Sequence, residues 1–81
     1  MTNRSVMLFA RYAELFGAER VAVDLPEGAT VATLIDALRA LPGGALLPTR
    51  PVVAVDHTTA ELTMVIPSEA ELALLPPLAG G

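Results

Sequence analysis

The stretch that decides the fold runs from Thr30 to Gly44 and reads TVATLIDALRALPGG. Its large apolar residues recur at the spacing of one helix face: Val31, Leu34, Ile35, Leu38 and Leu41. Thr30 is a suitable N-cap, because its hydroxyl can accept a hydrogen bond from a free N–H of the first turn. Pro42, Gly43 and Gly44 end the pattern. The stretch therefore predicts one amphipathic helix that must bury a single apolar face.

Two strands and a short helix are predicted ahead of this helix. The run from Val6 to Ala10 is apolar without interruption, which predicts an interior strand covered on both faces. Residues 12–16 carry apolar side chains at helical spacing, and Gly17 can adopt the left-handed conformation that ends a helix. From Arg20 to Leu25 apolar and polar residues alternate, which predicts a half-exposed strand.

After the main helix, the sequence predicts a loop and then two or three short strands. The segment from Ala45 to Pro51 holds two prolines and reads as the loop. The expected strands are 52–55, 62–66 and 72–75, with turns at 56–59 and 67–71. Pro76 and Pro77 have no N–H to donate, so sheet pairing should end there.

This order of elements predicts an α+β protein with the β-grasp, or ubiquitin-like, fold. One capped helix across one face of a mixed sheet is the simplest way to bury both apolar faces. We expect four to five strands, one main helix and a short second helix. The expected β-grasp domain spans residues 1–75, and an extended C-terminal tail spans 76–81. The other face of the sheet stays uncovered, which exposes apolar residues of the first and last strands.

Composition agrees with an exposed apolar surface. Of the 81 residues 53% are hydrophobic and the mean hydropathy is +0.57, more than one small core is expected to hide. The net charge of −4 argues against nucleic acid as a partner and fits a basic protein better. No run approaches the roughly 20 apolar residues of a membrane span, and residues 1–5 do not resemble a signal peptide. We expect a cytoplasmic protein without a membrane partner.

Several kinds of chemistry are excluded by what the side chains lack. There is no cysteine, which removes disulfides, zinc–thiolate sites and a catalytic thiol. There is no lysine either, so the chain offers no side-chain amine for acylation. His57 is the single histidine, and we expect it to be solvated in a turn rather than to bind a metal. Glu69 and Glu71 are expected in a solvated turn; the alternative is that they meet arginines of a partner enzyme.

The chain ends LLPPLAGG, from Leu74 to Gly81, which suggests a working terminus. A carboxylate must be activated before it can be transferred, most simply as an acyl-adenylate made from ATP in a site that excludes water. Glycine has no Cβ, so Gly80 and Gly81 can enter a narrow channel. Proline favours extended backbone, so Pro76 and Pro77 reduce the freedom lost when the tail is inserted. A disordered end without a role is the alternative.

The sequence resembles the MoaD/ThiS family of ubiquitin-like sulfur carriers, to which the small subunit of molybdopterin synthase belongs. The similarity runs over nearly the whole chain. The matching segments are Phe9–Arg11 with Glu14–Gly17, the Thr30 cap with its helix, Val53–Val55, and the tail Leu75–Gly81. The chain has Asp56-His57 where the family often has an asparagine, and Leu74-Leu75 where it often has aromatic residues.

The resemblance implies a cycle centred on Gly81. An ATP- and Mg-dependent E1-like enzyme adenylates this residue, and a sulfurtransferase converts the adenylate to a thiocarboxylate. The carrier then docks on the large molybdopterin synthase subunit and gives its sulfur to a cyclic pyranopterin precursor, forming the dithiolene. Two sulfurs per product imply a heterotetramer with two carriers. The chain itself is then a non-catalytic subunit and sulfur-donating cosubstrate that binds no cofactor of its own.

The resemblance also implies which residues meet the partners. Gly80 threads the tail, and the partner-binding residues are Phe9, Leu75, Pro76, Pro77, Leu78 and Ala79. Other destinations for the sulfur stay open: thiamin, cysteine or tRNA thiolation, or conjugation to proteins as a modifier. A plain β-grasp binding module whose tail does nothing is the third alternative.

Overall fold

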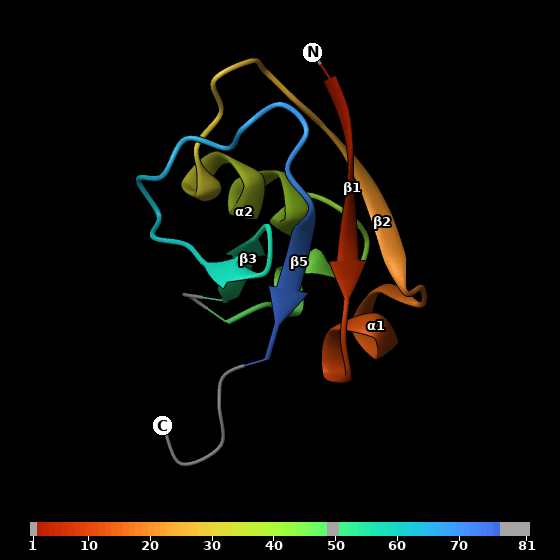
Figure 1. Ribbon diagram of the computed structural model, residues 1–81. Helices are drawn as coiled ribbons and strands as arrows, with labels where there is room; N and C mark the ends of the chain where they lie inside the picture. Colours follow the sequence, from red (N-terminus) through yellow and green to blue (C-terminus); the bar gives the residue numbers. More distant parts are fainter. Residues whose placement is uncertain (1, 49–50, 77–81) are drawn as a thin grey trace.

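The computed structural model describes residues 2–48 and 51–76 of the chain (Figure 1). Its elements follow in the order predicted, strand, short helix, strand, main helix, then short strands. They are β1 (Thr2–Leu8), α1 (Arg11–Phe16), β2 (Arg20–Leu25), α2 (Val31–Arg39), the 3₁₀ turn η1 (Gly44–Leu46), β3 (Val52–Val55), β4 (Thr58–Thr59) and β5 (Leu72–Leu75).

The strands form one five-stranded mixed sheet in the order β2-β1-β5-β3-β4. The central strand β5 runs parallel to its neighbour β1, and every other neighbouring pair is antiparallel. The buried residues of α2 share one hydrophobic core with those of the strands, so α2 covers one face of the sheet. The predicted β-grasp arrangement of a mixed sheet, one main helix and a short second helix is confirmed.

Both helices have the terminal residues that were predicted to cap them. The Thr30 hydroxyl accepts a hydrogen bond from the Thr33 N–H at 3.3 Å, and this caps α2. Gly17 ends α1 with φ 71° and ψ 22°, a left-handed conformation in which glycine is the favoured residue. Leu41 lies beyond the end of α2 but still packs against the core.

The prediction of a strand over residues 6–10, covered on both faces, is wrong in two respects. β1 begins at Thr2, because its polar first half pairs with β2 from Thr2↔Leu25 onward. It ends at Leu8, and Phe9 is 41% exposed. Within the strand, Val6 and Leu8 are buried but Met7 is only half-buried. The strand is central in the sheet, yet only the face toward α2 is covered.

Two predictions for the second half of the chain also need correction. Residues 58–59 do not belong to the turn, because they form β4 and pair with Val55 and Ala54 of β3. The turn is only Asp56-His57, with φ of 50° and 68°. Residues 62–66 do not form a strand and make a single bridge, Thr30↔Val65.

The segment 62–66 is held by helix α2 rather than by the sheet. The carbonyls of Leu62 and Met64 accept hydrogen bonds from the N–H groups of Ala32 and Val31, each at 3.0 Å. These N–H groups lie in the first turn of α2 and have no partner within the helix. The segment therefore completes the helix N-terminus, and its carbonyls are not available for a ladder.

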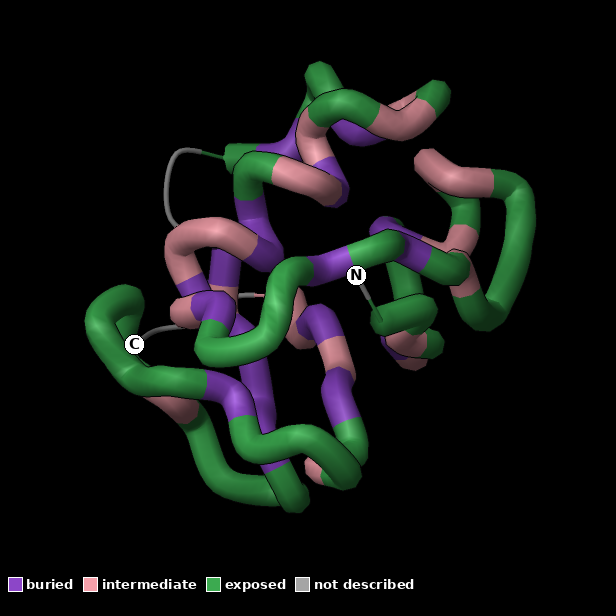
Figure 2. The backbone as a smooth tube through the Cα atoms, turned by 90° about the horizontal axis from the view of Figure 1, so that it is seen from above, coloured by how far each residue is buried: buried purple, intermediate pink, exposed green. Residues whose placement is uncertain are grey.

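The core lies between α2 and the covered face of the sheet. Figure 2 shows the buried segments toward the middle of the molecule and long exposed stretches at its periphery. The least exposed large side chains come from β1, α1, α2, β3 and β5: Tyr12, Leu34, Leu38, Leu72, Leu74, Val6, Val31 and Val53. None of the described helices is long and apolar enough to cross a membrane.

We predict that Gly44→Ala destabilises the protein by about 2 kcal/mol, because an added methyl group overpacks a closed site. A Cβ at Gly44 would collide with the Leu38 carbonyl oxygen and with the Arg39 backbone. The matched control is Gly28→Ala, where the Cβ meets open space but φ is +78°. The control should cost about 1 kcal/mol. Urea unfolding measures both changes, and equal losses would show that the close approach at Gly44 is not rigid.

A second prediction separates the two faces of β5. Leu74 is fully buried, whereas its neighbour Leu75 is half-buried on the opposite face. Leu74→Ala should lower the free energy of unfolding by about 3 kcal/mol, since it leaves a cavity in the core. Leu75→Ala should cost about 1 kcal/mol or less. Urea unfolding of the two variants tests this, and comparable losses would mean that the outer face is also part of the folding core.

Candidate functional site

The tail leaves the domain from the end of β5, which is the middle strand of the sheet. β5 pairs with β1 from Leu72 to Leu74, and with β3 from Leu72 to Leu75. Strand β5 ends at Leu75, so the predicted loss of pairing at Pro76 is confirmed. Ladders on both sides hold β5 as far as Leu74, the ladder with β3 continues to Leu75, and Pro76 follows directly.

Most of the predicted tail residues fall outside the described part of the chain. Pro76 is described and is half-buried. Pro77, Leu78, Ala79, Gly80 and Gly81 lie outside the described residues, so their roles stay predictions. What the structure does give is the surface from which these residues start.

The open face of the sheet carries an apolar strip next to the tail. The register places Met7 of β1, Ala73 of β5 and Ala54 of β3 in one row across the three strands. Leu75 lies opposite Val52 in the next row. Residues that share a row point to the same side of a sheet, which here is the side away from α2. The strip therefore combines small central side chains with larger ones near the tail.

A shallow hollow of about 190 Å³ lies in this strip. Its apolar lining comes from Met7, Phe9, Ala54, Ala73 and Leu75. Phe9 and Leu75, which the sequence analysis assigned to partner binding, are thus brought together on one surface. Small side chains at Ala54 and Ala73 leave space between larger neighbours. Such a hollow can receive one apolar side chain of another protein.

The polar edge of this hollow is an ion pair that the sequence analysis missed. His57 Nε2 lies 2.8 Å from Glu71 Oε2. The Asp56 N–H donates to the Glu71 carbonyl at 2.8 Å, and the Glu71 N–H donates to Asp56 Oδ1 at 2.9 Å. His57 is exposed as expected, but Glu71 is not simply solvated. The pair forms because the β3–β4 turn is carried next to the start of β5, which no local pattern reveals.

The ion pair shapes the hollow more than it stabilises the fold. The side chains of His57 and Glu71 are 84% and 49% exposed, and exposed pairs contribute about 0–1 kcal/mol. A partner arginine could still approach Glu71, but it would compete with His57 for the carboxylate. Contact between Glu71 and a partner arginine therefore requires the His57–Glu71 pair to open.

Two larger hollows meet at Pro76, one on each side of the start of the tail. The first is a groove of about 850 Å³ that runs from Val52 and Leu75 to the 59–63 segment. The second, of about 460 Å³, lies between α1, the segment 46–48 and Pro76. Neither hollow was predicted from the sequence, because each is completed by a loop segment, 46–48 or 60–63, whose path has no periodic signal. The start of the tail is therefore surrounded by concave surface.

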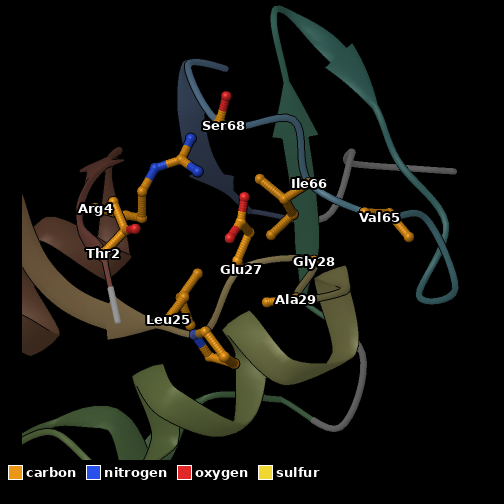
Figure 3. Close-up of a pocket in the computed structure, with 10 residues that line it drawn as sticks. Thr2, Arg4, Leu25, Glu27, Gly28, Ala29, Val65, Ile66 and Ser68 are labelled. Atoms are coloured by element: carbon orange, nitrogen blue, oxygen red, sulfur yellow. The ribbon is translucent and has the colours of Figure 1, made fainter.

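A fourth hollow, of about 330 Å³, lies at the start of β1, away from the tail (Figure 3). The charged residue Arg4 has a structural role there. Arg4 lies at its edge and donates to the carbonyls of Pro67 and Ala70 at 3.1 and 2.7 Å. Its guanidinium thus fastens the segment before β5 to β1. Within residues 2–48 and 51–76 no group of three or more His, Asp or Glu side chains is placed to hold a metal ion.

Comparison with known proteins gives the same fold and a family. A family model described as the ThiS family matches residues 6–81. SAMP1 from Haloferax volcanii has 30% identity and a TM-score of 0.79, covering 99% of this chain and all of that one. A second structure, of H. volcanii small archaeal modifier protein 1, has 29% identity and a TM-score of 0.81, covering 96% of this chain and all of that one.

A more distant structure is the complex of subunits 1 and 2 of the molybdopterin-converting factor from Helicobacter pylori 26695. Its identity is 17% and its TM-score is 0.68, with 99% of this chain and all of that chain covered, which shows a shared fold. No curated protein matches the chain. Because the family model covers nearly the whole sequence and the β-grasp fold agrees with it, the chain belongs to the ThiS family of MoaD/ThiS-type ubiquitin-like sulfur carriers.

Proposed function

We propose that this protein is the sulfur-carrier subunit of molybdopterin synthase and that its sulfur is carried on the terminal carbonyl of Gly81. The observation that carries the proposal is the position of β5. This strand is fixed on both sides by β1 and β3 and continues directly into the tail, beside an apolar hollow. A rigid base next to a docking surface is what a tail needs if its end must reach a reaction centre accurately.

The first step in the proposed cycle is activation of Gly81 by an ATP-dependent E1-like enzyme. One carboxylate oxygen attacks the α-phosphorus of ATP, pyrophosphate leaves, and a mixed anhydride with AMP forms. The enzyme supplies Mg²⁺ and the groups that stabilise the phosphates. The carrier contributes a slim terminus and a surface that aligns it, because none of its described side chains lies in a cluster suited to metal chemistry.

The second step exchanges oxygen for sulfur. A sulfurtransferase provides sulfur at the oxidation level of sulfide, which attacks the acyl carbon while AMP leaves with the bonding electrons. The product is a thiocarboxylate at Gly81. A thiocarboxylic acid is more acidic than a thiol, so it is anionic and nucleophilic at neutral pH. The absence of cysteine fits a carrier whose sulfur is held on the backbone terminus.

The third step takes place on the large synthase subunit, where the thiocarboxylate sulfur bonds to a carbon of the cyclic pyranopterin precursor and displaces an oxygen there. Water then cleaves the acyl–sulfur bond, which leaves the sulfur on the precursor and restores the Gly81 carboxylate. The apolar strip around Phe9 and Leu75 supplies the docking surface, and the net charge of −4 favours a basic partner. The Helicobacter pylori structure of this fold is a complex with a second subunit, which supports a partner of this kind. Two sulfurs per product require two carriers, hence a heterotetramer.

A second candidate function is that of a protein modifier, joined through Gly81 to amines of other proteins. The similarity to small archaeal modifier protein 1, at 29–30% identity over almost the full length, favours it. Both functions begin with the same adenylate and differ in the nucleophile that follows. The chain has no lysine, so a modifier of this sequence could not build chains on its own side chains.

The test is intact-mass spectrometry of the protein produced together with the activating enzyme and sulfurtransferase of its own genome. We expect the mass to rise by the difference between a sulfur and an oxygen atom. The purified product should then convert the cyclic precursor to the dithiolene when it is mixed with the large subunit. A sulfur-loaded protein that is inactive there, but forms amide adducts with other proteins, would contradict the synthase role and support the modifier.

We predict that deleting Gly81 abolishes sulfur loading while the free energy of unfolding changes by less than about 0.5 kcal/mol, because Gly81 is a chain-terminal residue, six positions after the last residue of β5 in the sequence. A matched variant with one tryptophan added after Gly81 should also fail, since it blocks the narrow site and moves the carboxylate. Intact-mass spectrometry and urea unfolding are the measurements. Normal loading of the extended variant without trimming would overturn the proposal.

A further inference from the structure

The hollow between α1, the segment 46–48 and Pro76 has features of a contact surface; we call it the Leu46 hollow. Its volume is about 460 Å³, and its lining includes Ala10, Arg11, Tyr12, Leu15, Leu46 and Pro48, with Pro76 at its edge. Leu46 is 72% exposed, the highest exposure among the described large hydrophobic side chains that reach the surface. The tail therefore starts at the rim of an apolar cavity that is distinct from the open face of the sheet.

The walls of the Leu46 hollow are tied to the core and to α2 by burial and hydrogen bonds. Leu47 is buried, and its carbonyl accepts a hydrogen bond from Arg39 Nη1 at 3.0 Å. The Pro48 carbonyl accepts a hydrogen bond from Nη2 of the same guanidinium. Tyr12, only 2% exposed, belongs to the hydrophobic core, and its N–H donates to the Phe9 carbonyl at 3.0 Å. Because Leu47 points inward, its neighbour Leu46 is held in the solvent.

The short tail brings any protein that encloses Gly81 close to the Leu46 hollow. Five residues follow Pro76, and fully extended they reach at most about 17 Å. A protein that encloses the carboxylate of Gly81 away from water must therefore bring the mouth of its channel close to Pro76. Pro76 lines both the Leu46 hollow and the groove on its other side, so a body of protein size at that distance meets these surfaces.

We propose that the Leu46 hollow is a second docking surface for the protein that activates Gly81, an inference that rests on the proposed function. The occupant is an apolar side chain at the mouth of the activating enzyme's channel, seated between Leu46 and Leu15. The partner carries a carboxylate beside that side chain, which pairs with Arg11. The start of the tail is then held from two sides, by the Leu46 hollow and by the strip around Phe9 and Leu75.

Arg11 places a positive charge at this contact, which favours a carboxylate on the partner. It is exposed at the start of α1 and lines the hollow. Within the described residues the single ion pair is His57–Glu71, so Arg11 has no acidic partner there. The chain as a whole is acidic, and Arg11 is therefore a local positive site beside the tail. A partner carboxylate at this point would fix the orientation of the carrier as well as add attraction.

The experiment measures carrier-dependent ATP–pyrophosphate exchange by the activating enzyme encoded in the same genome. Leu46→Asp should raise the KM for the carrier at least about tenfold, the loss typical of a central apolar contact. Arg11→Glu should raise it by a similar factor, and Arg11→Lys should stay within about twofold of the wild-type protein. The kcat should change little, because the terminus is unaltered once it is bound.

The matched control is Val65→Asp. Val65 is 56% exposed and lines the hollow at the opposite end of the sheet, so the same change of charge and polarity is made away from the tail. Its KM should equal that of the wild-type protein. Urea unfolding of each variant should show differences below about 0.5 kcal/mol, since both positions are at the surface. A shared rise in KM for Leu46→Asp and Val65→Asp would overturn the proposal, because net charge alone would explain it.

Two further arms test other occupants of the hollow. In the first, calorimetry measures binding of carriers that lack residues 77–81 to the same enzyme. Leu46→Asp should weaken this binding too, by about tenfold; an effect that vanishes without the tail would mean that the hollow holds the chain's own tail. In the second, sedimentation should show a monomer for the wild-type carrier, and a dimer dispersed by Leu46→Asp would assign the hollow to a second copy.

The outcomes separate this inference from the proposed function. If the wild-type carrier is activated and Leu46→Asp has the same KM, the second docking surface is wrong and the carrier role stands. If the wild-type carrier supports no exchange at all, the carrier role fails and the inference fails with it. The expected pattern supports both: raised KM for Leu46→Asp and Arg11→Glu, and an unchanged KM for Val65→Asp and Arg11→Lys.

Discussion

The pairing of β5 with strands on both sides is the constraint on which the rest of the molecule depends. The parallel pair β1–β5 occupies the middle of the sheet and joins the first strand of the chain to the last. A parallel pair requires the chain to cross over between its members, and here α2 lies within that crossover and covers the sheet. Arg4 adds a tie by donating from β1 to the segment just before β5. The point where the tail begins is thereby set by long-range contacts.

One-sided covering of the sheet divides β5 into two sets of residues with different tasks. Leu72 and Leu74 are buried under α2, whereas Ala73 and Leu75 face the open side. Because side chains alternate along a strand, a four-residue segment can serve the core and a contact surface at once. The small side chains Ala54 and Ala73 matter for their size, since larger ones would fill the hollow next to Phe9. The high apolar content of the sequence follows from this double demand on a small number of strands.

The parts of the fold that were predicted from the sequence are those with a local physical cause. Helix α2 has its periodicity and the Thr30 cap within one stretch, and β2 has clean alternation, so both were predicted closely. The first half of β1 is polar, and it is a strand because it pairs with β2, with Asn3 Nδ2 donating to Asp24 Oδ1 at 3.2 Å. Residues 62–66 have the sequence pattern of a strand, but the Leu62 and Met64 carbonyls accept hydrogen bonds from α2. For the site, Phe9 and Leu75 were proposed from the family resemblance and line one hollow, whereas the His57–Glu71 pair and the Leu46 hollow depend on contacts between distant segments.

The geometry around Pro76 bears on how a carrier could serve more than one partner. In the proposed cycle the activating enzyme and the synthase subunit both enclose the same terminus, so both must approach the same ring of surface within the reach of five residues. They therefore compete, and neither can bind so tightly that the carrier fails to leave. Contacts divided among small hollows of about 190 and 460 Å³ allow modest attraction from each side instead of one deep anchor. The domain surface is identical at every stage of the cycle, and only the terminal group changes from carboxylate to adenylate to thiocarboxylate. A partner must then distinguish loaded from unloaded carrier inside its channel. There the terminal group is out of water, so its electrostatic interactions with the partner are strongest.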